Sequence, residues 1–204
     1  MSWEKRQAMY QLAKKYGVLI LEDNPYGDLR FSGEPIPPVK SLDEDGLVVY
    51  CGSFSKVISP GMRVGYAIAP QTLLQKMIVC KQGEDVHTNI WSQMVCHEFM
   101  TRYDFDAHLE RLRTIYREKS AYTMRLMNEH LVPNGITYLP IEGGLFLWCT
   151  LPQGVDMPAF CKEAVLRKVC VVPGNAFLTD ENEPCQSFRI NYSTPTDEQL
   201  KRGH

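Results

Sequence analysis

A lysine on a short loop between two apolar runs constrains the fold of this chain more than any other feature. The β-branched run Leu47–Tyr50 predicts a buried strand, and Val64–Ala69 predicts a second one. Lys56 lies between them, before the turn made by Pro60 and Gly61. A lysine without a function is unfavourable in this place, because its ammonium group loses hydration when the site closes. The same desolvation favours the neutral amine, which is a nucleophile.

Side chains that suit a phosphate group flank this lysine. Ser53 and Ser55 precede Lys56, with Phe54 between them, and Arg63 follows at the start of the next apolar run. A serine hydroxyl donates one hydrogen bond to a phosphate, and an arginine can donate two parallel ones. The stretch therefore predicts an anion site beside a reactive amine.

A second polar segment follows an earlier apolar run. Val18–Leu21 is wholly apolar, which predicts a parallel strand buried on both faces, and Asp23 and Tyr26 come directly after it. Ligands of α/β sheets bind beyond the carboxyl ends of strands, so both side chains are candidates for a ligand site. The alternative for Asp23 is a turn or helix-capping role before Pro25. The lysine loop at the next strand end favours the ligand site.

The pattern SFSKxxxPGxRxGY resembles the cofactor-lysine segment of the pyridoxal-phosphate aminotransferases of fold type I, class I/II. The match is specific because order, spacing and strand context agree together. The resemblance implies that Lys56 bonds covalently to the aldehyde of pyridoxal 5'-phosphate. It also implies that Ser53 and Arg63 bind the cofactor phosphate, with the hydroxyl of Ser55 nearby.

The segment EDNPYGDL extends the same resemblance. It implies that Asp23 pairs with the protonated pyridine nitrogen of the cofactor and that Tyr26 hydrogen-bonds its phenolic oxygen. A carboxylate beside the ring nitrogen keeps that nitrogen protonated, and the cationic ring then draws electrons from the α-carbon of the substrate.

Arg189 lies in the apolar strand-like run Phe188–Tyr192, where an unpaired guanidinium is expensive. A buried salt bridge is one explanation. The resemblance implies another, in which Arg189 binds the α-carboxylate of the substrate through two hydrogen bonds. Gly143-Gly144 and the run 175–177 are weaker candidates for the substrate side.

Periodicity and helix breakers predict alternating helices and strands along the whole chain. Helices are expected over Ser2–Tyr16 with Ser2 as N-cap and Gly17 as stop, and over Thr72–Gln82, Asn89–Tyr103, Asp104–Leu131, Met157–Lys168 and a partial one after Pro195. Further strands are expected over Ile136–Leu139, Leu145–Cys149 and Val169–Val172, and a solvated loop over Phe31–Asp45.

The predicted fold class is α/β with two domains. Residues 1–103 are expected to be the carboxy-terminal part of the large cofactor-binding domain, a mostly parallel sheet with helices. Residues 104–204 are expected to be a long connecting helix and a small α/β domain. Complete members of the family carry a long further stretch before the equivalent of Met1. We therefore expect this chain alone to hold half a pocket, to bind the cofactor weakly and to turn over little.

Composition excludes several classes of function. The formal net charge of −2 gives no reason to expect nucleic acid or an anionic membrane as partner. No apolar run approaches the roughly 20 residues of a spanning helix, and the first ten residues are charged and polar, so a cytoplasmic protein is expected. The seven cysteines are scattered singly and are expected to be reduced core residues. The histidines have no ligand spacing and are expected at the surface or in packing, so no metal site is predicted.

The resemblance implies an enzyme that moves an amino group between an amino acid and a 2-oxo acid, as a homodimer when full-length. The segments EDNPYGDLRF and SPGMRVGY resemble the corresponding segments of the 2-aminoadipate and multi-substrate branch of the family. Two alternatives stay open. One is a β-lyase or decarboxylase on the same fold and cofactor. The other is the aminotransferase-like sensor domain of a transcription regulator, preceded by a DNA-binding domain.

Overall fold

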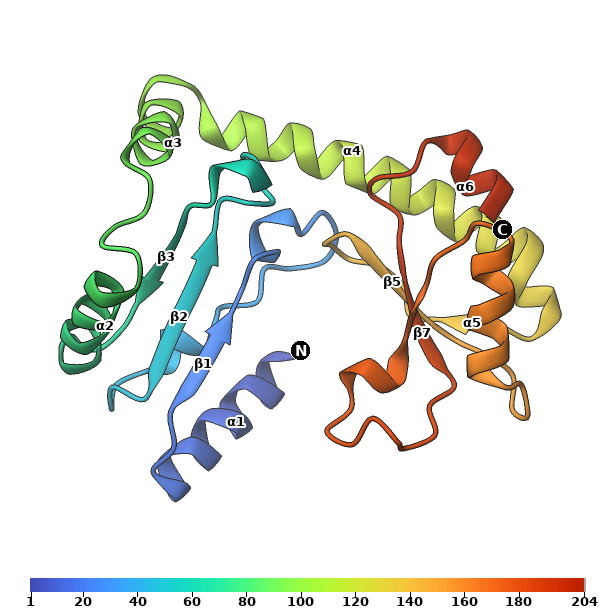
Figure 1. Cartoon of the computed structure of the whole chain (residues 1–204), viewed down its shortest axis with the longest axis horizontal. Helices are drawn as coiled ribbons and strands as arrows, with labels where there is room; N and C mark the ends of the chain where they lie inside the picture. Colours follow the sequence, from blue (N-terminus) through green and yellow to red (C-terminus); the bar gives the residue numbers. More distant parts are fainter. Residues whose placement is uncertain (204) are drawn as a thin grey trace. The chain divides into compact units, whose positions relative to one another are not determined.

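The computed structural model describes residues 1–203, which form two compact units (Figure 1). The first unit is Met1–Leu112 and the second begins at Arg113, so the division falls inside helix α4. The sequence predicts a domain boundary at residue 104, just before that helix begins. Each unit has its own sheet and its own helices, as the predicted α/β class requires.

The first unit contains a three-stranded sheet and the helices before and after it. Its strands are β1 (Ile20–Asp23), β2 (Val48–Ser53) and β3 (Gly65–Ile68). Its helices are α1 (Trp3–Tyr16), α2 (Gln71–Glu84), α3 (Ile90–Arg102) and the beginning of α4 (Phe105–Leu126). Strand β1 pairs in parallel with β2, and β3 pairs antiparallel with β2, so the sheet order is β1-β2-β3.

Helix α1 begins and ends where the sequence predicts. The Ser2 Oγ accepts a hydrogen bond from the backbone N–H of Lys5 at 3.5 Å, and Gly17 ends the helix in the left-handed region at φ 63°. On its buried face Tyr10 joins Val39 and Val48 in a core cluster. This cluster fixes α1 and the segment before β2 against the sheet.

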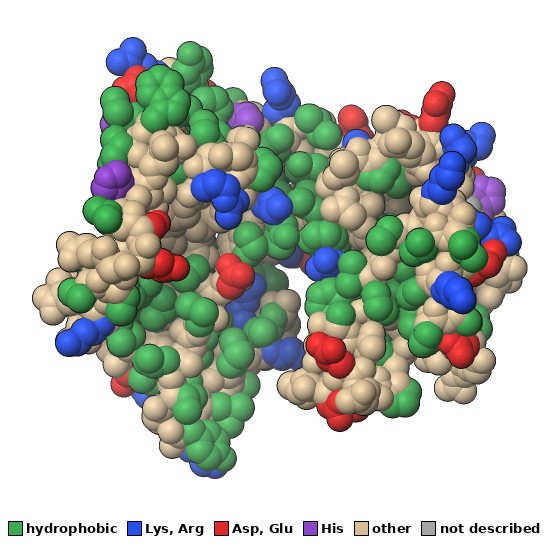
Figure 2. All heavy atoms as spheres, in the orientation of Figure 1, with side chains coloured by type: hydrophobic (Ala, Val, Ile, Leu, Met, Phe, Trp, Pro, Cys, Tyr) green, Lys and Arg blue, Asp and Glu red, His purple; other side chains and the backbone are tan. Residues whose placement is uncertain are grey.

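The prediction that Val18–Leu21 is a strand buried on both faces is wrong. The strand is Ile20–Asp23, and its residues alternate between half-buried and exposed. Ile20 packs against the core cluster, whereas Leu21 points to the other face and is 69% exposed. The physical reason is that β1 is an edge strand and the described residues of the unit cover only one of its faces. Figure 2 shows apolar side chains gathered at the end of the unit where α1 leads into β1.

The second unit contains a four-stranded antiparallel sheet in the order β4-β5-β7-β6. Its strands are β4 (Thr137–Tyr138), β5 (Phe146–Thr150), β6 (Val172–Pro173) and β7 (Ser187–Asn191). Helices α5 (Met157–Leu166) and α6 (Asp197–Gly203) accompany it. The strand expected at Val169–Val172 is wrong in extent. Lys168 takes the left-handed conformation at φ 66° and delays pairing until Val172.

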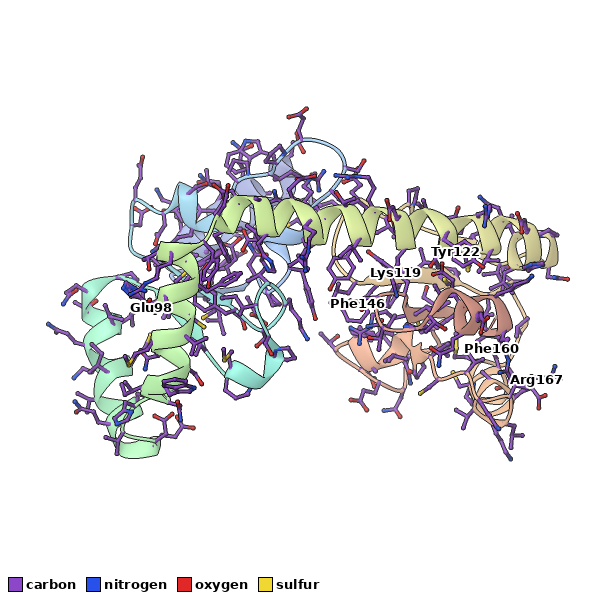
Figure 3. All side chains as sticks on the ribbon, turned by 90° about the horizontal axis from the view of Figure 1, so that it is seen from above. Glu98, Lys119, Tyr122, Phe146, Phe160 and Arg167 are labelled. Carbon is purple, nitrogen blue, oxygen red and sulfur yellow. The ribbon has the colours of Figure 1, made fainter. Side chains whose placement is uncertain are left out.

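The long helix predicted over Asp104–Leu131 is confirmed. Helix α4 runs over Phe105–Leu126 and continues as a wider π-helical turn over Met127–Leu131. Lys119 on α4 donates from Nζ to the backbone oxygens of Ser193 at 3.0 Å and Pro195 at 2.6 Å (Figure 3). These bonds fix the connection between β7 and α6 to the helix.

Leu147, Phe188 and Tyr192 form the buried centre of the second unit. The Tyr192 hydroxyl donates to the Gly144 backbone oxygen at 2.5 Å, which holds the loop before β5. Burial, followed by the nearby Tyr116, raises the pKa of Tyr192, so this phenol stays neutral and keeps its hydrogen bond in mildly alkaline solution.

The cysteines divide by exposure, which corrects the prediction that they are core residues. Cys96 and Cys149 are buried, but Cys80 and Cys170 are exposed. Burial raises the pKa of the Cys149 thiol to about 12, so the reactive thiolate is scarce there at pH 8.5. We expect a thiol reagent at that pH to label Cys80 and Cys170 at least about a hundredfold faster than Cys149. Peptide mapping by mass spectrometry measures this, and equal labelling after urea unfolding is the control. Fast native labelling of Cys149 would contradict the packing.

Candidate active site

The carboxyl ends of β1 and β2 lie at one edge of the sheet of the first unit. Asp23, the last residue of β1, pairs opposite Cys51, close to the end of β2 at Ser53. Ser53 pairs opposite Gly65, the first residue of β3. Because β3 runs back from this edge, the whole connection between β2 and β3 lies there. Tyr26 follows Asp23 at the same edge.

The connection after β2 is a tight helical turn around Lys56. The backbone oxygen of Phe54 accepts hydrogen bonds from the N–H groups of Ile58 at 2.8 Å and Ser59 at 3.2 Å. The Phe54 N–H donates to the Val64 oxygen at 3.1 Å, which closes the base of the loop. Lys56 is therefore held on an ordered turn rather than a loose loop.

The Lys56 amine is half-buried and uncompensated. Within residues 1–203 its Nζ has no hydrogen bond and no ion pair. The Ser53 Oγ accepts a hydrogen bond from the Ser55 backbone N–H at 3.1 Å, which holds the Ser53 hydroxyl at the start of the turn. A partly desolvated ammonium group without a partner is unfavourable, so the turn is suited to an incoming ligand.

Arg63 stands at the end of the same connection in an unusual backbone conformation. Its φ of 54° lies in the left-handed region, which costs a residue other than glycine about 1 kcal/mol or more. The side chain is exposed, and its Nη1 donates to the Pro60 oxygen at 3.1 Å. Its remaining N–H groups stay available to an anion.

Asp23 and its neighbours tie the two strand ends together. The Asn24 N–H donates to the Cys51 oxygen at 2.9 Å, and the Asn24 Nδ2 donates to the Tyr50 hydroxyl at 3.0 Å. Asp23 itself is exposed. Asp23 lies opposite Cys51 in the register of β1 and β2, and burial, followed by the negative charge of Asp23, raises the pKa of the Cys51 thiol.

An aromatic group beside the site was not predicted from the sequence. The Tyr66 ring lies 5.7 Å from the Phe54 ring and 6.3 Å from the Tyr50 ring, centroid to centroid. It crosses Gly52, where a Cβ atom would come within 2.2 Å of the Tyr66 ring. The only local signal was the glycine in the strand, which often marks a close approach.

Arg189 lies in β7 of the second unit and packs against aromatic rings. Its guanidinium carbon is 4.1 Å from the centroid of the Phe146 ring and 4.9 Å from that of Phe177. Such contacts stabilise a cation at the ring faces. Within the described residues no carboxylate pairs with it, so the alternative of a buried salt bridge is not what the structure shows. The guanidinium edge is left for an anion.

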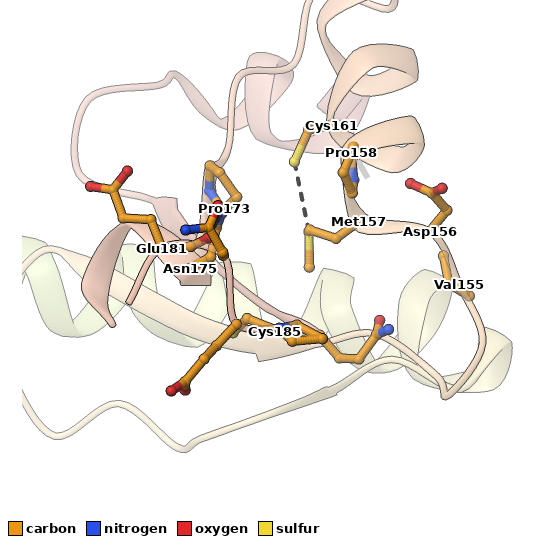
Figure 4. Close-up of a pocket in the computed structure, with 13 residues that line it drawn as sticks. Val155, Asp156, Met157, Pro158, Cys161, Pro173, Asn175, Glu181 and Cys185 are labelled. Atoms are coloured by element: carbon orange, nitrogen blue, oxygen red, sulfur yellow. Dashed lines mark hydrogen bonds between the residues drawn. The ribbon is translucent and has the colours of Figure 1, made fainter. Parts of the chain in front are cut away.

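A pocket of about 420 Å³ lies elsewhere in the second unit, between the start of α5 and the segment before β7 (Figure 4). Asp156, Met157 and Cys161 line one side, and Pro173 and Cys185 line another. None of the predicted catalytic or cofactor-binding residues lines it. Asn175, from the run 175–177 that the sequence offers as a weaker candidate for the substrate side, does line it.

Residues 1–203 contain neither a metal site nor a membrane-spanning helix. No group of three His, Cys, Asp or Glu side chains is placed to hold a metal ion. No helix in that part of the chain has the length and apolar character needed to cross a membrane.

Residues 1–203 match the family model described as aminotransferase class I and II, and the chain therefore belongs to this family. The resemblance seen in the lysine segment is confirmed over the whole described chain. Its fold is that of fold type I aminotransferases, with helices around one mixed and one antiparallel sheet.

Three relatives agree with this assignment. Over its full length the chain is 34% identical to aromatic-amino-acid aminotransferase 1 of Thermococcus litoralis, of which it covers 48%. Its sequence is 34% identical to that of the multiple substrate aminotransferase of Thermococcus profundus. The crystal structure of that protein matches this fold with a TM-score of 0.92, over all of this chain and 50% of that one. The chain is 33% identical to LysN, the α-aminoadipate aminotransferase of Thermus thermophilus, with a TM-score of 0.86, covering 97% of this chain and 51% of that one. The chain thus spans about half the length of the relatives it matches.

Proposed function

We propose that the protein containing this chain is a pyridoxal-phosphate-dependent aminotransferase that moves an amino group between an amino acid and a 2-oxo acid. The observation that carries the proposal is the uncompensated Lys56 amine, held on an ordered turn at the edge where β1 ends in Asp23. Family membership supports it, and LysN was solved in complex with N-(5'-phosphopyridoxyl)-L-leucine.

The donor set at this edge fits the cofactor. Pyridoxal phosphate carries an aldehyde, a dianionic phosphate and a ring nitrogen that is most useful when protonated. Lys56 supplies an amine without a competing ion pair, and Arg63 supplies N–H groups for the phosphate. The exposed carboxylate of Asp23 suits the protonated nitrogen. The charge of Arg63 is opposite to that of the phosphate, and the charge of Asp23 is opposite to that of the protonated ring nitrogen.

Each residue then has a proposed task. When bound, the cofactor supplies an aldehyde for amines and a ring that withdraws electrons from the substrate α-carbon. The Lys56 amine acts as the base of a 1,3-proton shift: it takes a proton from the substrate α-carbon and returns it two atoms away. Ser53, Ser55 and Arg63 bind the phosphate and so orient the ring.

Two further side chains complete the proposal for the cofactor and substrate. Tyr26 would donate a hydrogen bond to the phenolic oxygen of the cofactor. This bond would influence the protonation of the nitrogen that joins the cofactor aldehyde carbon. Arg189 binds the substrate carboxylate with its free edge while Phe146 and Phe177 support its faces.

We extend the proposal to the organisation of the whole protein. Residues 1–103 belong to the large cofactor-binding domain, and residues 104–204 form the connecting helix and the small domain. The natural protein works in the cytoplasm as a homodimer. Its substrates resemble those of the multi-substrate and 2-aminoadipate aminotransferases to which the chain is similar.

Product analysis tests the reaction class. We expect the natural protein, supplied with pyridoxal phosphate and 2-oxoglutarate, to convert an amino acid into its 2-oxo acid with matching formation of glutamate. Candidate amino acids are 2-aminoadipate, the aromatic amino acids and leucine. Omitting the 2-oxoglutarate should stop the reaction after at most one turnover per site, because the amino group has no acceptor. Chromatographic amino acid analysis measures both products.

The same assay separates the alternatives, which the relatives reported above do not favour. Release of ammonia would indicate a β-lyase, and release of carbon dioxide would indicate a decarboxylase. Binding of an amino acid without any product, together with a basic DNA-binding domain in the natural protein, would indicate a regulator. Any of these results would overturn the aminotransferase proposal.

A further inference from the structure

The carbonyl next to Lys56 in the sequence is bound by a histidine from a distant element. The Nε2 of His108 lies 2.7 Å from the backbone oxygen of Val57. A carbonyl oxygen can only accept, so Nε2 must carry the hydrogen and donate. The contact is part-buried, and it joins the first turn of α4 to the turn that carries Lys56.

The position of the His108 ring is fixed from two sides. The Phe99 ring meets it edge-on at 5.0 Å between centroids, and the Phe105 ring stacks on it at 6.2 Å. The backbone of His108 is fixed as well, because its N–H donates to the Asp104 oxygen at 3.1 Å. The packing of the imidazole already restricts its rotamer, so the hydrogen bond from Nε2 to the lysine turn costs little further side-chain entropy.

The receiving end of this hydrogen bond is equally constrained. Val57 is only 4% exposed, and its own N–H donates to the Phe54 oxygen at 3.3 Å. The Val57 N–H belongs to the peptide group shared with Lys56, and the Val57 oxygen belongs to the next peptide group, shared with Ile58. Both peptide groups after the Lys56 Cα are therefore hydrogen-bonded, which restricts the movement of that Cα.

We propose that His108 is a positioning residue for Lys56: it fixes the lysine turn to α4 through the Val57 carbonyl and so sets the direction of the amine. The part of this inference that concerns the reaction rests on the proposed aminotransferase function. His108 does not touch the reacting atoms. The structure thereby adds a specific hydrogen bond to the packing role that the sequence predicts for this histidine.

Two variants of the natural protein distinguish the hydrogen bond from packing. In His108→Phe the ring stays between Phe99 and Phe105 but the donor is lost. In His108→Gln the amide Nε2 takes the place of the imidazole Nε2 and restores the donor. His97→Phe, at an exposed position on α3, is the matched control.

The first measurement is hydrogen exchange, which needs no cofactor. The amides of Val57, Ile58 and Ser59 all donate to Phe54 within the turn. We expect His108→Phe to speed their exchange about five- to tenfold, and His108→Gln to keep it within about twofold of the parent. Exchange in β5 and β7 should not change in either variant. Parent-like exchange in His108→Phe, or equal loss in both variants, would overturn the proposal.

The second measurement is the reaction of Lys56 with pyridoxal phosphate, trapped by borohydride and located by peptide mass spectrometry. We expect the yield at Lys56 to fall at least about fivefold in His108→Phe and to recover in His108→Gln. An unchanged yield in His108→Phe would contradict the positioning role. If the parent protein is not labelled at Lys56 in preference to exposed Lys76, the proposed function fails, and the exchange experiment still decides whether His108 holds the turn.

Discussion

Replacing Lys56 with alanine is expected to lower the rate of amino-group transfer by roughly a thousandfold or more. The variant loses both the amine that bonds to the cofactor and the base that moves the α-proton. The turn itself should persist, since its hydrogen bonds are made by the backbone from Phe54 to Val64. Steady-state kinetics with the preferred amino acid measures the loss, and borohydride trapping should find no modified peptide at position 56.

Two controls make this result specific. Lys76→Ala removes a lysine that is exposed on α2 and should keep the parent rate. Lys56→Arg keeps a positive charge at the turn but cannot release its proton at neutral pH, so it should be as inactive as the alanine variant. A Lys56→Ala protein within about tenfold of the parent rate would refute the assignment of Lys56, because a base and nucleophile are normally worth more than that.

Replacing Asp43 with alanine is expected to destabilise the first unit by about 3 kcal/mol. The carboxylate is 1% exposed and pairs with Lys40 at 2.8 Å. It also accepts hydrogen bonds from the N–H groups of Leu47 at 2.8 Å and Val48 at 3.0 Å, which hold the start of β2. The alanine variant leaves the N–H groups of Leu47 and Val48 without this acceptor, and the Lys40 ammonium keeps only the Val48 oxygen. Urea unfolding followed by circular dichroism measures the loss.

The Asp43 carboxylate also predicts how stability depends on pH. Burial opposes its charge, but the hydrogen bonds from Lys40, Leu47 and Val48 outweigh burial and lower its pKa. A lowered pKa in the folded state means that this stabilisation is present above the ordinary aspartate pKa of about 4. It is lost as the pH falls through the lower, folded pKa. In Asp43→Asn this part of the acid dependence should disappear.

An exposed pair of the same type provides the control. Lys81 in the last turn of α2 and Asp85 directly after that helix are 2.9 Å apart, but their side chains are 45% and 50% exposed. Water solvates both charges before and after the change, so Asp85→Ala should shift the urea midpoint very little. If Asp43→Ala shifts the urea midpoint as little as Asp85→Ala does, the start of β2 does not depend on the buried carboxylate.

The structure separates what local sequence can encode from what it cannot. Helix ends were predictable because Ser2 and Gly17 act on backbone groups within a few residues of themselves. The burial of β1 was not predictable, since an apolar run reads the same in a central strand and at an edge. The extent of β6 was also missed, because Lys168 takes a left-handed conformation that its residue type does not suggest.

The same distinction applies to the candidate site. Order and spacing gave Lys56, Ser53 and Arg63, because these residues share one short connection between two strands. The Tyr66 ring over Gly52 and the hydrogen bond from His108 to Val57 depend on contacts between separate elements. No spacing of residues in the sequence predicts such contacts.

The sequence by itself determined the family, the alternation of helices and strands, and the lysine turn with its hydroxyls and arginine. Each of these depends on residues close together in the chain or on a pattern carried by one segment. Only the tertiary structure decided that, within residues 1–203, Lys56 lacks an ion pair and Arg189 stacks on Phe146 and Phe177 instead of pairing with a carboxylate. The same holds for the hydrogen bond from α4 to the lysine turn. The physical reason is that burial and pairing are set by which distant surfaces meet when the chain packs.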